Sequence, residues 1–169
     1  MKYDNLTISY DDYKAAQLLH LTPRKKFKLF LYPLLFLLIS AFLFFTYHFF
    51  QGNGYEREFY IFIVCIAYLA LIFLIIHPWK WRKIYEQQKF FETKFDYEFT
   101  NEALCSRSDL GNATLPWVQF HKWKENKNTF IVYQSDAIFH LIPKRIFHSE
   151  EEINQLRVIL KDSIKQVIT

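Results

Sequence analysis

Two long uncharged segments limit what this chain can fold into. No Asp, Glu, Lys or Arg occurs from Leu29 to Phe50 or from Phe59 to Trp79. At about 1.5 Å per helical residue, each run is long enough to cross the apolar core of a bilayer. Two buried helices of a soluble core would need more surrounding protein than so short a chain provides. We therefore expect transmembrane helices within residues 23–50 and 59–79, joined by an extracytoplasmic loop at 51–58.

The cations around these runs predict their orientation. Basic residues stand before the first run and after the second, whereas the connecting loop has one cation, Arg57, beside two glutamates. Positively charged flanks favour the cytoplasmic side, and tryptophans favour the headgroup zone. Both termini are therefore expected to be cytoplasmic, in a multi-pass membrane protein. The residues expected at the membrane interface are Arg24, Lys25, Lys26, Lys28, Trp79, Lys80, Trp81, Arg82 and Lys83.

The sequence pattern of the polar parts of the chain predicts strands and short helices. Residues 1–22 predict a cytoplasmic strand and a short helix, with Ser9 and Asp12 at the spacing of a capping box. A juxtamembrane helix is expected over 80–94. From Phe95 the apolar period changes to two, and turn signals follow at intervals of about ten residues, which is typical of an antiparallel meander. Residues 114–124 are expected to form a single strand of it, and the N-terminal strand could join the same sheet.

The segment "LIPKRIFHSEEE" joins the last predicted strand to a C-terminal helix. Pro143 cannot donate to a sheet ladder and should end the strand. Ser149 and Glu152 again have capping-box spacing, and the apolar residues after them recur at helical spacing. That stripe consists of Ile153, Leu156, Leu160, Ile164 and Val167. Only Lys144 and Arg145 have no role in this local structure.

Several short segments follow one another in a recognisable order: "LTISYDDY", two apolar spans, "YEFTNEAL", "LPWVQFHKWKENKNTFIVYQSDAIFHLIPKRIF" and "SEEEINQLRVIL". Their order and spacing resemble those of the YcxB-like family of bacterial membrane proteins. The resemblance implies a small pleckstrin-homology-like cytoplasmic β domain over 95–169, closed by its amphipathic C-terminal helix and tethered by a helical hairpin. The expected fold class is thus membrane α+β. The family has no generally established activity, so no catalytic residue is carried over.

Motifs for common chemistries are missing from the sequence. The six histidines include no H-x-x-x-H pair, the two cysteines form no C-x-x-C, and no serine lies in a nucleophile elbow. His121 and His140 could face each other across strands, but we expect sheet-surface or hydrogen-bonded histidines. Three glycines are too few for a phosphate loop, and a net charge of +4 without a recognisable module does not favour nucleic acid. We expect no enzyme, no cofactor and no metal.

Two functional hypotheses remain open. The first is a non-enzymatic inner-membrane protein whose YcxB-like domain binds a protein partner or an anionic lipid surface. The alternative is an immunity protein that neutralises a cognate antibacterial toxin. The candidate contact residues are Lys144, Arg145, Lys122 and Lys124. Membrane lipids are expected partners, a homo-oligomer is possible, and the basic residues at the interface could also serve only to set topology.

Overall fold

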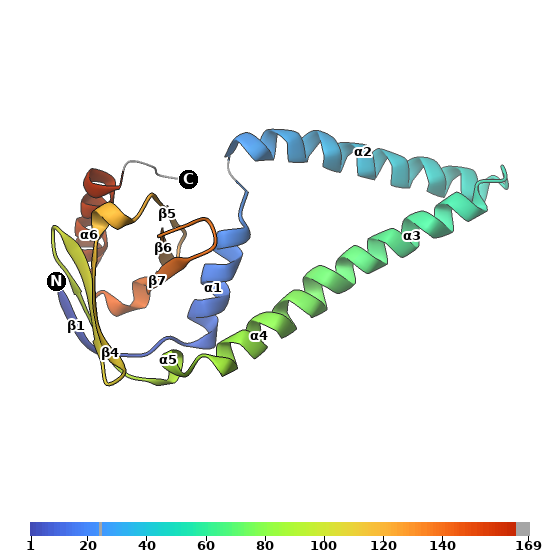
Figure 1. The fold of residues 1–169 in the computed structure, drawn as a ribbon. Helices are drawn as coiled ribbons and strands as arrows, with labels where there is room; N and C mark the ends of the chain where they lie inside the picture. Colours follow the sequence, from blue (N-terminus) through green and yellow to red (C-terminus); the bar gives the residue numbers. More distant parts are fainter. Residues whose placement is uncertain (24, 165–169) are drawn as a thin grey trace. The chain divides into compact units, whose positions relative to one another are not determined.

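The computed structural model describes residues 1–23 and 25–164, excluding the side chains of residues 25–28 and 30. The chain divides into two compact units (Figure 1). One consists of Met1–Thr22 together with Arg82–Thr169, and the other is Pro23–Trp81. The first unit therefore combines segments that the sequence presents as separate regions.

Two antiparallel sheets form the framework of the first unit. One has the strand order β1-β2-β3-β4 and the other the order β5-β6-β7. The strands of the first sheet are β1 (Lys2–Leu6), β2 (Phe95–Phe99), β3 (Ala103–Ser108) and β4 (Gly111–Pro116). Those of the second are β5 (Lys122–Glu125), β6 (Thr129–Tyr133) and β7 (Phe139–Pro143).

Strand β1 joins the sheet as the sequence predicts. Tyr3 lies opposite Tyr97 on β2, and the backbone N–H of Phe99 donates to the carbonyl of Met1. The alternation along β2 buries Phe95, Tyr97 and Phe99, each at most 5% exposed. The period-two pattern thus identified both the strand and its buried face.

The prediction of a single strand over 114–124 is wrong. Strand β4 ends at Pro116, residues Trp117–Gln119 form a 3-10 turn, and β5 begins the second sheet. Pro116 has no N–H for a ladder, and Trp117 is buried with its indole N–H donating to the carbonyl of Thr100 at 2.9 Å. Apolar residues such as Leu115, Trp117 and Phe120 continue through this corner, so the sequence pattern alone did not show it.

Helix α1 (Tyr10–Leu21) begins with the predicted capping box of Ser9 and Asp12. Its buried residues Tyr13, Ala16 and Leu19 lie three residues apart, and the helix contacts all three strands of the second sheet. The sheets and α1 therefore enclose one core (Figure 1).

The C-terminal helix α6 (Glu150–Ser163) differs from its prediction at its start. The Ser149 hydroxyl accepts from the N–H of Glu152, but the Glu152 carboxylate accepts from the N–H of His148 instead of Ser149. Glu152 also accepts a hydrogen bond from the Tyr3 hydroxyl, which fastens α6 to β1. The predicted apolar stripe is buried at Ile153, Leu156, Leu160 and Ile164, while Val167 lies outside the described residues.

The second unit consists mainly of two apolar helices. These are α2 (Lys25–Phe50) and α3 (Glu56–Leu71), which contact each other through ring pairs such as Phe42–Phe62 and Phe49–Phe59. The segments Leu31–Phe50 and Glu56–Gln87 are long and apolar enough to cross a membrane, and neither is buried inside the molecule.

A π-helical turn at Ile72–Ile76 follows α3 and leads into α4 (His77–Gln87). Pro78 cannot donate a backbone hydrogen bond, and the wider turn accommodates this missing donor without ending the helix. The helix predicted over 80–94 is interrupted, because Gln88 has an extended backbone and precedes the short helix α5 (Lys89–Glu92).

Candidate functional site

The four basic residues that the sequence analysis proposes as contact residues do not form an exposed patch. They are Lys122, Lys124, Lys144 and Arg145. Lys122 and Lys124 are only 6% and 8% exposed. Lys122 forms an ion pair with Asp136, and its ammonium group lies 4.6 Å from the centre of the Tyr133 ring. The side chains of these two lysines therefore belong to the packed interior of the first unit.

Lys124 bonds to the end of helix α1. Its Nζ donates to the backbone carbonyls of Leu19 at 3.3 Å, His20 at 3.1 Å and Thr22 at 2.8 Å. These carbonyls lie at the C-terminus of the helix, where the last turn has no intrahelical donors and the helix dipole favours a cation. A lysine 102 to 105 positions away in sequence thus supplies the hydrogen-bond donors for the last carbonyls of α1.

Arg145 and Lys144 also have internal partners. Arg145 makes a bidentate ion pair with Asp12 and donates to the carbonyl of Thr7 at 2.7 Å. Lys144 shares the Glu125 carboxylate with Arg157 of helix α6. Their charges are therefore largely compensated within the first unit, although the Arg145 side chain remains 51% exposed.

Both acidic partners have a lowered pKa. Burial opposes ionisation of Glu125, but hydrogen bonds from Arg157 and Lys144 outweigh it and bring its pKa below the ordinary value. Burial likewise opposes ionisation of Asp12, and the hydrogen bonds from Arg145 and Ser9 again reverse the effect on its pKa. Each carboxylate consequently stabilises the fold in its charged form.

We expect this stabilisation to fade in acid. A carboxylate with a lower pKa in the folded state contributes above its unfolded pKa and loses that contribution as pH falls through the folded value. The free energy of unfolding should therefore decline below about pH 4.5, the ordinary pKa of a glutamate. Glu125→Gln should reduce this slope and lower stability at neutral pH by about 1–3 kcal/mol, because two cations then lose their shared anion.

Urea unfolding followed by tryptophan fluorescence at several pH values measures both effects. Glu102→Gln is the matched control, because Glu102 is exposed and should change stability by less than about 0.5 kcal/mol. An equal pH slope in wild type and Glu125→Gln would show that the ion pairs do not couple protonation to folding.

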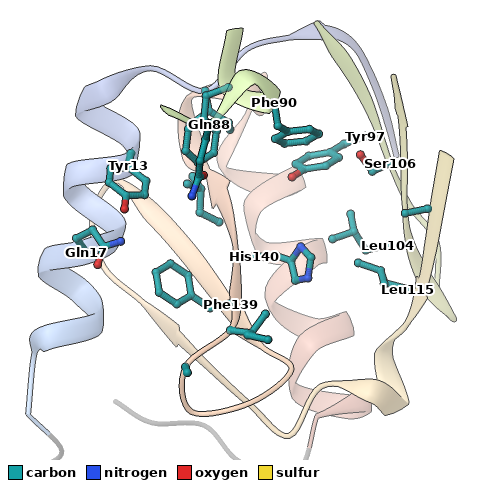
Figure 2. Close-up of a pocket in the computed structure, with 16 residues that line it drawn as sticks. Tyr13, Gln17, Gln88, Phe90, Tyr97, Leu104, Ser106, Leu115, Phe139 and His140 are labelled. Carbon is teal, nitrogen blue, oxygen red and sulfur yellow. The ribbon is translucent and has the colours of Figure 1, made fainter. Parts of the chain in front are cut away.

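A different site emerges between the sheets. A cavity of about 480 Å³ is lined by residues from α1, the α5 segment, β2 to β4 and β7 (Figure 2). Its inner end has the buried residues Tyr97, Leu104 and Leu141, whereas Ala113 and Ile138 are exposed at its mouth. Its volume is within the usual range for small-molecule sites.

His140 is the unusual polar residue of this cavity. In Figure 2 its ring lies between Phe139 on one side and Leu104 and Leu115 on the other. Its Nε2 atom is buried and has no hydrogen-bond partner within the part of the chain that the structure describes. Burial lowers the pKa of His140, so the ring is neutral at pH 7. The expectation of a surface or hydrogen-bonded histidine is therefore wrong for this atom.

The lining offers little for catalysis. No Asp, Glu, Lys, Arg or Cys occurs among the described residues that line the cavity. Within residues 1–23 and 25–164 no group of three or more His, Cys, Asp or Glu side chains is placed to hold a metal ion. The polar groups are hydroxyls, amides and one imidazole, which suit recognition of a neutral molecule.

Sequence reasoning did not find this cavity because its residues come from four distant segments. They lie within 8–17, 88–91, 97–115 and 137–141. No short spacing connects these segments. One signal in the sequence is a pair of small side chains, Ser106 and Ala113, which lie opposite each other on neighbouring strands.

The interface residues of the sequence analysis are only partly described. Arg24 and the side chains of Lys25, Lys26 and Lys28 lie outside the described residues. The remaining five, Trp79, Lys80, Trp81, Arg82 and Lys83, all lie on α4. Arg82 pairs with Glu86 one turn later at 3.0 Å.

Comparison with known proteins agrees with the sequence resemblance. Residues 99–160 match the family described as YcxB-like protein. The chain is 27% identical over 112 residues to "Uncharacterized protein YcxB" of Bacillus subtilis (strain 168), an alignment that covers 66% of this chain and 60% of that protein. No solved structure gives a significant match. The predicted resemblance to the YcxB-like family is therefore confirmed, and residues 99–160 carry it.

Proposed function

We propose that this protein is a non-enzymatic module of the bacterial inner membrane that binds a protein partner at the cytoplasmic face. The observation that carries the proposal is that the chain combines two apolar, unburied helices with a compact α+β unit that has its own buried core. Such helices need a nonaqueous environment, and a bilayer provides it. The polar unit is then held next to the membrane.

The proposed topology places both termini in the cytoplasm. The first unit contains residues from both ends of the chain, which supports a two-span hairpin with both ends on one side of the membrane. The cations around 24–28 and 80–83 favour the cytoplasmic side for that unit. Tyr55 and the loop around it would then face the outside.

The arrangement of the first unit supports a pleckstrin-homology-like interpretation. In the described part of the chain, four antiparallel strands are followed by three more in a second sheet and by a C-terminal helix. The apolar hairpin is inserted between β1 and β2. Because a fold does not determine a ligand, this likeness supports a binding module and no specific partner.

The surface of the first unit favours a protein partner over an anionic lipid. Lys122, Lys144 and Arg145 pair with carboxylates, and Lys124 bonds to carbonyls. By contrast, Val118 is 86% exposed and Val158 is 57% exposed, which are apolar positions that a protein partner could cover. In the proposed topology the cations of α4 would lie near the lipid headgroups.

The test uses the full chain in native membranes. In a Cys65→Ser/Cys105→Ser background, Gln51→Cys should react with a membrane-impermeant maleimide in intact spheroplasts. Asn101→Cys should react only after permeabilisation. The protein should also stay in the membrane pellet after a carbonate wash. Release by carbonate, or labelling of Asn101→Cys in intact spheroplasts, would overturn the proposed anchoring or topology.

The same membranes test the binding role. A photo-crosslinking amino acid at Val118 or Val158 should give one discrete protein adduct, and the same group at exposed Asp109 should give none. Adducts only with lipid would reject the protein partner and favour the lipid surface. A secreted toxin as the captured protein would instead support the immunity alternative.

A further inference from the structure

The cavity between the sheets extends from exposed lining residues at its mouth to buried ones at its inner end. Ala113, Ala137 and Ile138 are exposed at the mouth, and Ile138 is 58% exposed. Tyr97 and Leu104 at the inner end are 5% and 1% exposed. A molecule could therefore enter from the surface and become largely covered.

Strand register explains why this space exists. Tyr97, Ser106 and Ala113 lie opposite one another across β2, β3 and β4, and Leu104 lies opposite Leu115. Residues opposite each other in an antiparallel pair point to the same face. The first row therefore shrinks from tyrosine to serine to alanine toward the edge strand, which leaves room above the sheet. Larger side chains at Ser106 and Ala113 would fill it.

The charge of the lining limits what can occupy this space. Its described residues include several apolar side chains and neutral hydrogen-bonding groups, but no ionised side chain. An ion moved into such surroundings loses its hydration without gaining a counter-charge. A neutral, mainly apolar occupant is therefore favoured over a carboxylate, a phosphate or an amine.

His140 provides a polar contact for such an occupant. Its ring lines the cavity, and its Nε2 atom makes no hydrogen bond in the described chain. Buried polar atoms without a partner are rare in folded proteins and mark places where a water or ligand completes the hydrogen bonds. The Tyr97 and Ser106 side chains line the same cavity and add two hydroxyl groups (Figure 2).

We propose that this cavity binds a small neutral molecule that is mainly apolar and carries one hydrogen-bonding group, such as a hydroxyl or a carbonyl. Long-chain alcohols and the uncharged ester portion of a lipid share this chemistry. The inference is independent of the proposed protein partner, because occupancy of the cavity does not require the capture of a second protein.

The experiment is photolabelling of the full chain in native membranes, followed by mass spectrometry of the labelled peptides. The probe is a long-chain alcohol with a diazirine in its chain, and the matched alkane and carboxylate are comparison probes. The alcohol should label peptides from 104–115 and 137–141. Ala113→Phe should reduce that labelling about tenfold by narrowing the mouth. Asn112→Phe, on the opposite face of the same exposed strand, should leave it unchanged.

A second variant separates the polar contact from the available space. His140→Phe keeps a planar ring but removes both nitrogens. It should lower labelling by the alcohol about three- to tenfold, the effect of one lost hydrogen bond, and leave labelling by the alkane unchanged. It should also leave the thermal midpoint of the unliganded protein unchanged or higher, because an unpartnered buried polar atom has been removed.

Three results would overturn the proposal. The first is labelling confined to 31–50 and 56–76, which would show that the probe only dissolves around the apolar helices. The second is equal labelling of Ala113→Phe and Asn112→Phe when both variants retain the wild-type melting transition. The third is stronger cavity labelling by the carboxylate than by the alcohol, which would reject a neutral ligand.

Discussion

Removal of residues 1–21 should prevent folding of the YcxB-like region, although the family match begins only at residue 99. Residues 1–21 bury five apolar side chains, each at most 6% exposed: Tyr3, Ile8, Tyr13, Ala16 and Leu19. Full burial of a large apolar side chain contributes about 1.5–3 kcal/mol. Four such side chains give about 6–12 kcal/mol, which is comparable to the whole stability of a typical domain.

The effect of the deletion on folding is best measured together with an attempt to restore folding by adding the missing segment. The full chain in detergent should show a cooperative urea transition by tryptophan fluorescence, and the shortened chain should show none. A peptide of residues 1–22 added in trans should restore the transition. The same peptide with Ala16→Glu should not restore it, because Ala16 is completely buried and has no space for a charge. A shortened chain with the wild-type transition would refute the dependence on β1 and α1.

This dependence also affects how the protein can be divided for experiments. A fragment of residues 83–169 lacks the outer strand of one sheet and the helix that contacts the other. The family match covers residues 99–160, which is only part of the first unit, and so it does not mark the boundaries of that unit. A soluble version should instead keep residues 1–22 and 82–169 and replace only the apolar segment between them.

The parts of the fold that the sequence predicted depend on local physics. Strand β2 alternates apolar and polar residues because one face is buried. Helix α1 begins where Ser9 and Asp12 can satisfy its first backbone donors. The two apolar runs predict helices long enough for a bilayer by length and composition alone. Each of these predictions uses residues that are close together in the chain.

The parts that could not be predicted depend on contacts between distant residues. The corner after Pro116 is set by the buried Trp117 and its hydrogen bond to Thr100, which a local alternation does not reveal. Arg145 binds Asp12, 133 positions earlier. A sequence shows where charges occur but not which partners compensate them, so four basic residues looked available when three pair with acids and the fourth, Lys124, bonds to carbonyls.

The same limit applies to the cavity. Empty space results from small side chains on one sheet facing a second sheet, and the relation between the sheets is absent from any single segment. His140 was recognisable as a histidine in an apolar strand. Its unpartnered Nε2 became visible only once β7 and the residues around it were placed in three dimensions.

Lys124→Met should be the most damaging of the substitutions at the basic residues, lowering the free energy of unfolding by about 2–4 kcal/mol. Methionine preserves most of the aliphatic volume but cannot donate to the three carbonyls at the end of α1. Those acceptors would lose their charged donor in a site where the lysine is only 8% exposed. The cation also interacts favourably with the helix dipole, an effect that methionine cannot replace.

Lys127→Met provides the control because Lys127 is exposed three residues later in the same hairpin. It makes the same chemical change and should shift stability by less than about 0.5 kcal/mol. Urea unfolding of both variants in detergent gives the comparison, and added salt should weaken the Lys124 effect only slightly, because a buried contact is poorly screened. Equal destabilisation by the two variants would mean that the lysine contributes only its general positive charge. A selective loss at Lys124 would instead identify it as the side chain that holds Thr22, the last residue before the apolar segment, to the second sheet.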